Sequence, residues 1–326
     1  MNPLHPIVLL AYNRPQHTEQ VLVALQNNEL ANLSTLYVYI DGLKVNATEE
    51  DRAKHDAVIA IVNKEKWCAE VNVHVSDFNR GCRLGPIYSI SQVLSKYDAA
   101  IILEDDIITS PLFLQYMNAA LNYYINYKTV FSISGYNLPP HKLPIPEDYN
   151  YDVYVSLRQQ NWGWGTWHDR WTQVDWDKSF ISRFLLNKIQ VEAFNRGGND
   201  LSKMLAEEFN GDSDAWDIQF SFFHFKYRGV SIIPCHSFTN NIGLDNSGTH
   251  TIDKKSGDYE NNLSLCNKEF VFLDTLYDDK RILNAFYSAY YPHKRPLWKK
   301  MINYISRMIG FNNVFVVKKI VLKSRI

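Results

Sequence analysis

Three adjacent carboxylates, Glu104, Asp105 and Asp106, directly follow a short apolar segment. That segment, residues 99–103, is too short for a helix and is typical of a fully buried strand. The acids are then expected at the carboxyl end of the strand, the edge where open α/β sheets bind ligands. Neighbouring carboxylates repel one another unless a cation or hydrogen-bond donors compensate. Two interpretations follow: a site for Mg²⁺ or Mn²⁺, which accept oxygen ligands and bind substrate phosphates, or a solvated acidic turn.

The elements that must position these acids alternate regularly through the first 135 residues. Strands are predicted at 6–12, 36–40, 71–75, 99–103 and 130–134. Helices are expected from Pro15 onward and at 49–64, 87–96 and 110–126, the last with Ser110 and Pro111 as its cap and first-turn pair. This alternation is typical of right-handed βαβ units, so residues 1–135 are predicted to form an α/β domain of the nucleotide-binding type with a mostly parallel sheet.

The pattern changes after Gly135. A proline-rich surface loop is expected at 138–149, and a polar loop at 239–250. Helices are predicted at 181–194, at 201–209 and from the 212–217 segment to residue 227, with a strand at 230–234. We therefore divide the chain into residues 1–135, a second half at 136–255 and a C-terminal extension at 256–326.

Four tryptophans lie within ten residues, and Gly163 and Gly165 flank one of them, Trp164. Flat indole rings stack on sugar faces, and glycine permits close backbone approach. This pattern favours a position for Trp164 in a sugar or acceptor pocket. The alternative is a tryptophan-rich plug of the hydrophobic core.

Composition limits the partners and the compartment. The formal net charge is −1, which gives no indication of a nucleic-acid partner. The four cysteines are far apart and fit no zinc spacing, so reduced thiols in a cytosolic protein are expected. The sequence has no signal-peptide pattern and no apolar stretch of roughly 20 residues. These features predict a cytoplasmic protein.

The last 34 residues have a different character from the rest. Residues 293–326 contain nine Lys or Arg and no Asp or Glu. Apolar residues recur at three- and four-residue steps from Leu297 to Ile309, which predicts an amphipathic helix with a basic face. Such a helix favours peripheral contact with the inner face of an anionic membrane. The alternative is a helix packed on the protein's own core or on a second subunit.

Four motifs, spread over about residues 5–250, together resemble the GT-A glycosyltransferases, which have one Rossmann-like domain. Tyr12-Asn13-Arg14-Pro15 after the first strand resembles their opening motif, and Asp41 matches their base-reading aspartate. Glu104-Asp105-Asp106 resembles their metal-binding DxD element, in the form found in the inverting Golgi N-acetylglucosaminyltransferases. Trp216-Asp217 resembles the position of the catalytic base in those enzymes. Without an evident anchor and stem, the chain looks more like a bacterial cytosolic relative.

The resemblance implies an inverting, metal-dependent hexosyl- or N-acetylhexosaminyltransferase. It would move a sugar from a nucleotide-diphosphate donor to a hydroxyl of a glycan or lipid-linked acceptor. Asp106 is expected to contact Mn²⁺ or Mg²⁺, Asp105 the ribose or a metal-bound water, and Glu104 to make structural hydrogen bonds. Asp217 is expected to be the general base, with a pKa suited to proton abstraction beside Trp216, and Asp214 is the second choice. The remaining expected contacts are Tyr12, Arg14, Asp41, Arg83 and His250 for the donor, and Trp162, Trp164 and Trp216 for the acceptor.

Several of these residues also have a structural interpretation. Asp41 can be a turn aspartate before Gly42, Asp217 a helix N-terminal charge, and His250 a surface histidine. Two other classes of protein compete with a transferase. A haloacid-dehalogenase-type phosphatase fits poorly because the acids follow the fourth strand and the spacing ends at Ile108. A metal-dependent phosphatase or nucleotide-sugar hydrolase stays open as an alternative. A non-catalytic carbohydrate-binding protein would use the tryptophans without the acids.

Overall fold

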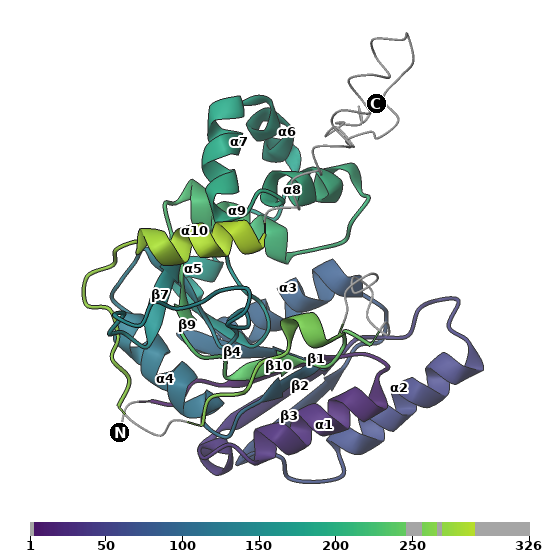
Figure 1. Cartoon of the computed structure of the whole chain (residues 1–326). Coiled ribbons are helices and arrows are strands. Elements are labelled where there is room, and N and C mark those ends of the chain that lie inside the picture. The colour runs from purple at the N-terminus through teal and green to yellow at the C-terminus, as the bar shows by residue number, and fades with distance from the viewer. Residues whose placement is uncertain (1–2, 246–255, 266–268, 291–326) are drawn as a thin grey trace.

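The computed structural model describes residues 3–245, 256–265 and 269–290. It is an α/β structure built on a mixed, mostly parallel sheet of eight strands with helices on both faces (Figure 1). The strands of this sheet, in chain order, are β1 (Ile7–Ala11), β2 (Thr35–Ile40), β3 (Glu70–Val75), β4 (Ala99–Glu104), β6 (Val130–Ser134), β7 (Val153–Ser156), β8 (Trp164–Trp167) and β9 (Val230–Pro234). The predicted α/β fold class is confirmed.

The order of strands across the sheet is β3-β2-β1-β4-β8-β6-β9-β7. The strands β3, β2, β1 and β4 are mutually parallel, as the alternating pattern predicts. Strand β8 then runs antiparallel to both β4 and β6, and β7 runs antiparallel to β9. The boundary expected at residue 135 falls between β6 and β7, and strands from both sides of it belong to this one sheet.

A second, two-stranded sheet lies beside the large one. It pairs β5 (Ile107–Thr109) with β10 (Thr239–Asn241) in antiparallel register, Ile108 facing Asn240. Because only two residues separate β4 from β5, the chain turns sharply at Asp105 and Asp106. The short pair therefore brings a segment more than 130 residues away in sequence next to the acids.

Helices cover both faces of the sheet, and further helices lie at one end of the molecule (Figure 1). They are α1 (Pro15–Gln26), α2 (Glu49–Val62), α3 (Gly81–Leu94), α4 (Phe113–Tyr124), α5 (His168–Trp171), α6 (Ser179–Leu186), α7 (Lys188–Phe194), α8 (Leu201–Asn210), α9 (Asp217–Lys226) and α10 (Lys280–Ala289). None of the helices in the described ranges is long and apolar enough to cross a bilayer.

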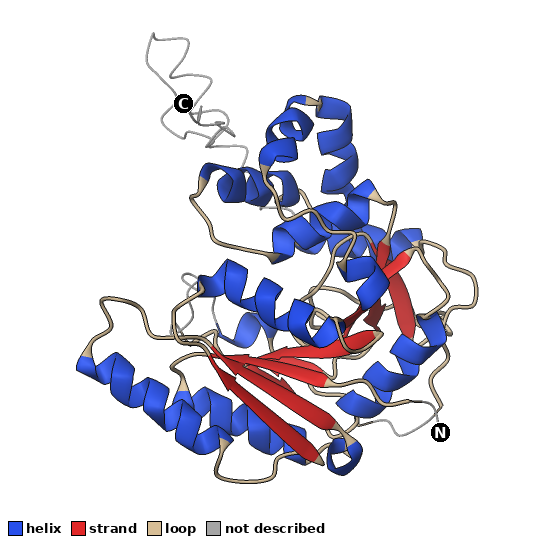
Figure 2. Ribbon diagram, turned by 180° about the vertical axis from the view of Figure 1, so that it is seen from behind, coloured by secondary structure: helices blue, strands red, loops and turns tan. Residues whose placement is uncertain are grey.

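Alternate residues of the central strands belong to two separate hydrophobic cores, one on each face of the sheet. Ile7 and Leu9 of β1 pack with α1, α2 and α4 on one face. Val8 packs on the other face with α3, α8 and α9, in a core rich in tryptophan and phenylalanine. Both faces of β1 are therefore dry, which explains the continuous apolar run that the sequence shows. Figure 2 shows the same layers from behind, with the strands fanned between the helices.

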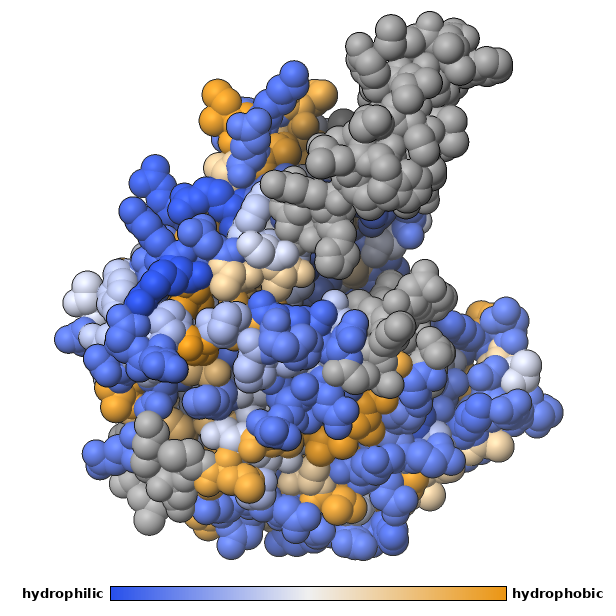
Figure 3. Space-filling model, viewed as in Figure 1, coloured by the Kyte–Doolittle hydropathy of each residue, from blue (hydrophilic) through white to orange (hydrophobic). Residues whose placement is uncertain are grey.

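Helices α6 to α10 gather at one end of the molecule, above the sheet in Figure 1. The helix predicted at 181–194 is two helices, because Asn187 interrupts it and its side chain accepts a hydrogen bond from the Gln190 N–H at 3.2 Å. At the α6–α7 junction Leu186 and Ile189 are 75% and 80% exposed. Apolar residues are visible at this tip in Figure 3.

A fully buried histidine ties the sheet to α9. The His224 ring bonds to the Phe220 carbonyl through Nδ1 at 2.8 Å and to the Ser132 hydroxyl through Nε2 at 2.9 Å. The Ser132 and Ser231 hydroxyl oxygens lie 2.9 Å apart in the same network, which therefore joins α9, β6 and β9. Burial lowers the pKa of His224 to about 4, and the ring is therefore neutral near pH 7.

Two expected helix starts are wrong. Helix α3 begins at Gly81 rather than at residue 87, with Pro86 inside it, because a distant carboxylate, that of Asp41, accepts the first N–H groups. Helix α4 begins at Phe113 because Ser110 and Pro111 lie in the preceding turn, where the Phe113 N–H donates to the Ser110 carbonyl. Neither start is visible from the local sequence alone.

Candidate functional site

Strand β4 delivers the three carboxylates to the edge that the sequence predicts. Glu104 is its last residue and faces Leu10 of β1. Asp105 and Asp106 lie in the turn before β5 and are only 4% and 5% exposed. Two neighbouring acids at this depth need compensation, since the repulsion between like charges 4 Å apart is about 4 kcal/mol at an effective dielectric of 20. A solvated acidic turn does not describe them.

Arg14 supplies the compensating charge. It occupies the connection between β1 and α1, and its guanidinium forms ion pairs with both Asp105 and Asp106. The Nη1–Oδ2 distance to Asp106 is 3.0 Å, and a backbone hydrogen bond from Tyr12 also reaches Asp105. Burial acts to lower the pKa of Arg14, but the two carboxylates outweigh it and raise the pKa. The resemblance placed Arg14 near the donor, and the structure places it on the acids.

The segment after β10 closes over Asp106. The Ile242 N–H donates to the Asp106 carbonyl at 2.9 Å, and a Cβ added at Gly243 would lie 2.2 Å from Asp106 Oδ2. Only glycine fits at this position without displacing the carboxylate. Two residues after Gly243, the Asp245 Oδ2 atom lies 3.2 Å from Nε2 of His17 in α1. This contact holds the segment after β10 against α1. No local sequence pattern marks Gly243 as a residue of this site.

Asp217, the expected general base, lies near the same acids although 111 residues separate it from Asp106. It is the first residue of α9, and its own carboxylate accepts from the Ile218 N–H at 2.9 Å. Asn161, in the connection between β7 and β8, donates to Asp217 Oδ2 at 3.5 Å. The negative charge of Asp217 is one of the causes that raise the pKa of Glu104, after burial and the charge of Asp106.

The acids perturb one another's protonation. Burial, the charge of Asp106 and the charge of Asp217 together raise the pKa of Glu104 to about 8. Burial also raises the pKa of Asp105, against the opposing effect of Arg14. Perturbed carboxyl groups that converge at the ligand-binding edge of a sheet are typical of functional sites. This convergence of Arg14, Glu104, Asp105, Asp106 and Asp217 is what we call the acid site.

The acid site fits a divalent cation only in a particular way. Asp106 Oδ1 is buried and has no hydrogen-bond partner in the described part of the chain, so one oxygen is available as a ligand. No group of three His, Cys, Asp or Glu side chains in the described ranges has the arrangement of a metal site. Mg²⁺ in proteins is often bound by one or two carboxylates, with water and substrate phosphates completing the shell. The residues fit a cation that binds together with a diphosphate.

The Asp41 carboxylate is hydrogen-bonded to groups of the protein itself. Its carboxylate accepts from the backbone N–H groups of Gly42, Arg80 and Gly81 and from Asn79 Nδ2, at 2.8–3.1 Å. It therefore fixes the start of α3, where Gly81 has a φ of +76°. These contacts match the structural interpretation of Asp41 as a turn residue rather than the expected contact with a nucleotide base.

Arg83 is likewise engaged by the protein. Its guanidinium donates to Gln219 Oε1 and to the Trp176 carbonyl, and its Nε lies 3.2 Å from the fully buried Glu208. Lys178 forms an ion pair with the same Glu208. The cluster joins α3 to α8 and α9. In this structure Arg83 supports the helices above the site, which differs from the expected contact with the diphosphate.

The remaining predicted donor and base residues are dispersed. Asp214 is exposed, and its Oδ2 would lie 3.2 Å from a Cβ added at Gly81, so it sits at the start of α3. The Tyr12 ring lies edge-on to His55, with 6.1 Å between centroids. His250 lies outside the described residues. Of the two candidate bases, Asp217 is the one whose charge reaches the acids.

The tryptophan segment is mainly core. Trp164 is 0% exposed and packs on Trp216, 5.2 Å between ring centroids, and on Phe220. This corrects the expectation of a sugar pocket around Trp164 and supports the core-plug alternative. Gly165 is needed because a Cβ there would crowd the Ala100 carbonyl and the helix α4 side chains, not because a ligand approaches. Trp216, expected at the acceptor, is 4% exposed in the same core.

Trp162 differs from these tryptophans because it is only partly buried. Its ring lies against Tyr136, 4.5 Å between centroids, and near Tyr259 at 6.2 Å. It immediately follows Asn161, which contacts Asp217. Trp162 is therefore the predicted acceptor residue whose position still agrees with that role.

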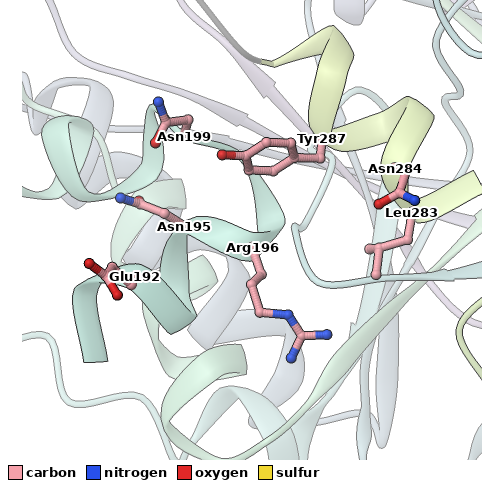
Figure 4. A pocket seen from close by; sticks show the side chains of 7 residues that line it. All are labelled: Glu192, Asn195, Arg196, Asn199, Leu283, Asn284 and Tyr287. Carbon is pink, nitrogen blue, oxygen red and sulfur yellow. The ribbon is translucent and has the colours of Figure 1, made fainter. Parts of the chain in front are cut away.

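A pocket of about 330 Å³ lies elsewhere, between α7 and its following turn and helix α10 (Figure 4). Glu192, Asn195, Arg196, Leu283 and Tyr287 are among its lining residues. It contains none of the acid-site residues and none of the predicted ones. We therefore assign it no part in the chemistry.

Comparisons with known proteins give structural similarities only. No protein-family model and no curated protein matches the sequence. S. aureus TarS, residues 1–349, is 10% identical over 73% of this chain, which spans 60% of that chain, at a TM-score of 0.43. A Pyrobaculum calidifontis mannosyltransferase solved with GDP-Man and Mn²⁺ is 9% identical over 69% of each chain, at 0.39. The galactosyltransferase LgtC, solved with donor and acceptor sugar analogues, is 13% identical over 68% of this chain and 70% of its own, at 0.33.

Two of these three proteins are described as sugar transferases, and the present chain is similar to them in structure. Similarities of this size do not by themselves carry an activity, a donor or a metal over to this chain. The acid site and the sequence motifs that contain its residues are the basis for a function.

Proposed function

We propose that this protein is a GT-A-type glycosyltransferase that moves a sugar from a nucleotide-diphosphate donor to a hydroxyl group of a glycan or lipid-linked acceptor. The observation that carries the proposal is the convergence of Arg14, the Glu104–Asp106 segment and Asp217 at one edge of the sheet. These residues come from three distant parts of the sequence. Each belongs to a different motif of the sequence.

The chemistry makes three demands, and this chain has a residue for each. The charge of the leaving diphosphate must be neutralised, the acceptor hydroxyl must lose its proton, and both groups must be held in line. Arg14 is the cation of the acid site, and Asp217 is placed to accept the hydroxyl proton. Asn161 orients the Asp217 carboxylate, and Trp162 beside it offers an indole face to an acceptor sugar.

A divalent cation bound with the donor would stabilise the negative charge that develops on the leaving diphosphate. Asp106 would hold it through the unpartnered Oδ1, and Asp105 would remain on Arg14 or meet the donor's ribose. A single-displacement reaction with Asp217 as base inverts the anomeric configuration.

A panel of UDP, GDP, CMP and dTDP sugars with Mn²⁺ tests the proposal directly. We expect one nucleotide sugar to raise the melting temperature and to release its nucleotide slowly in the absence of acceptor. Asp106→Asn should abolish Mn²⁺-dependent nucleotide binding while the circular dichroism spectrum is unchanged. Asp56→Asn, an exposed carboxylate of α2, is the matched control. No stabilisation and no turnover with any donor would refute the proposed function.

A further inference from the structure

The Arg14 guanidinium is ion-paired with two buried carboxylates, those of Asp105 and Asp106. One carboxylate oxygen of Asp106 has no hydrogen-bond partner in the described residues. The Arg14 side chain is 22% exposed, while those of Asp105 and Asp106 are 5% and 7% exposed. It occupies Asp106 Oδ2 and leaves Oδ1 without a partner. In the described part of the acid site, Arg14 is the only cationic side chain that is ion-paired with these acids.

We propose that Arg14 is a resident counter-cation of the acid site, which makes binding of a divalent cation weak by itself and strong together with a diphosphate. The inference rests on the proposed function, because it takes Asp106 as the metal ligand. It adds a role for Arg14 that the resemblance does not supply: control of metal affinity and of the order in which metal and donor bind.

The argument is electrostatic. A divalent cation on Asp106 Oδ1 would share one carboxylate with the Arg14 guanidinium, and the two positive charges repel each other. The repulsion is weakly screened here because Asp106 is only 5% exposed, with Ile242 and Gly243 packed against it. A diphosphate carries enough negative charge to pair with both cations. The cation and the diphosphate should therefore bind cooperatively, and the cation alone should bind poorly.

Removing the guanidinium should lower the stability of the metal-free protein and raise the affinity of the acid site for a cation. Without Arg14 the buried acids repel one another, so the metal-free protein is less stable and the acid site attracts a cation more strongly. Arg14→Gln should therefore bind Mn²⁺ alone roughly ten- to a hundredfold more tightly than the wild type. The stabilising effect of inorganic pyrophosphate on Mn²⁺ binding should shrink in the same variant.

The experiment measures Mn²⁺ binding by electron paramagnetic resonance of the free ion, with and without pyrophosphate. Melting temperatures are measured in parallel, in EDTA and in Mn²⁺. Arg52→Gln is the control, because Arg52 is an exposed arginine of α2 whose ion pair with Glu49 lies on the surface. It should leave the Mn²⁺ affinity unchanged. Arg14→Lys keeps the charge but cannot bridge both carboxylates, so we expect a smaller gain in affinity.

Unchanged or weaker Mn²⁺ affinity in Arg14→Gln overturns the inference. If that variant is unfolded in EDTA and folds with Mn²⁺, the inference is supported. If it does not fold in either condition, Arg14→Lys decides by the same comparison of Mn²⁺ affinity with the wild type. A protein that transfers sugar in EDTA, while neither form binds Mn²⁺, would overturn this inference and leave the glycosyltransferase proposal in place.

Discussion

Asp217 is the residue whose removal should separate binding from chemistry most cleanly. Asp217→Asn keeps the size of the side chain and its contact with Asn161, but an amide does not accept the hydroxyl proton. We expect donor affinity to stay within about twofold and transfer to fall by about 10²–10⁴-fold, the usual contribution of a general base. Donor affinity is read by thermal shift and transfer by release of nucleoside diphosphate in the presence of acceptor.

Asp214→Asn is the matched control for this experiment, because Asp214 lies three residues away and is exposed at the start of α3. Its transfer rate should remain close to that of the wild type. If Asp214→Asn removes activity and Asp217→Asn does not, the assignment of the base is wrong by one helical turn.

Trp164 should affect stability and not affinity. Its side chain is fully buried against Trp171, Trp216 and Phe220. Trp164→Phe removes part of a packed ring system and leaves a cavity, so unfolding should become easier by about 1–3 kcal/mol, below the cost of truncating a buried tryptophan to alanine. Urea denaturation measures this change, and donor titration should give an unaltered dissociation constant. A normal melting temperature with weakened binding would restore the pocket interpretation.

At the scale of elements, the buried His224 network should make stability depend on pH. The pKa of His224 is lowered to about 4 in the folded protein, whereas an unfolded chain has the ordinary value near 6.5. Between these values the unfolded state binds the proton and the folded state does not. Stability is therefore highest above about pH 6.5 and decreases as the pH falls toward 4, by up to about 3 kcal/mol from this group.

Other groups titrate over the same range, so the measurement is a comparison. Urea denaturation of the wild type and of His224→Gln at several pH values between 7.5 and 4.5 gives the difference in unfolding free energy. The advantage of the wild type should shrink steadily with acid. A difference that stays constant with pH would show that His224 does not titrate as its burial indicates.

The sequence predicts most elements that local pattern controls. The strands β1, β2 and β4 consist mostly of apolar residues, β3 alternates valine with polar residues, and α1 and α2 have clear starts at Pro15 and Thr48. Strands β7 and β8 were missed because their partners lie far away in the chain, and the glycine and tryptophans of Trp164–Trp167 do not resemble a strand. The early start of α3 was missed for a related reason, since its N–H acceptor is Asp41.

The candidate site divides in the same way. The acids, Arg14 and Asp217 are visible in the sequence because each directly follows a strand or opens a helix. Asn161 and Gly243 were not selected, because neither has a local pattern and only the folded chain brings them to the acids. Arg83 and Asp41 illustrate the opposite case. Their charge predicts a ligand contact, and in this structure both side chains are engaged in networks within the protein.

At the scale of the whole molecule, the remaining prediction concerns the basic tail. Residues 293–326 lie outside the described part of the chain. The prediction of membrane contact rests on the sequence of this segment, which has nine basic residues and apolar residues at three- and four-residue steps. The helix before them, α10, is held by Ile282 and Phe286, which are 1% and 2% exposed. A chain that ends at Tyr291 therefore keeps α10 and should stay folded.

Liposome flotation tests the tail. Full-length protein should float with anionic vesicles at low salt, and much less with neutral vesicles, because basic residues near an anionic surface contribute about 1 kcal/mol each. The chain ending at Tyr291 should remain in the lower fraction with an unchanged melting temperature. Full-length protein that stays in solution with every lipid mixture would favour a tail that packs on the protein or on a second subunit.

The position of β8 between β4 and β6 has a consequence for synthesis on the ribosome. When β4 emerges from the exit tunnel, its neighbour on one side is complete, but the other neighbour lies about 60 residues later in the sequence. At roughly 5–20 residues per second, this apolar strand waits several seconds with an open edge. We therefore expect the first half of the nascent chain to be prone to aggregation until Trp167 has been translated.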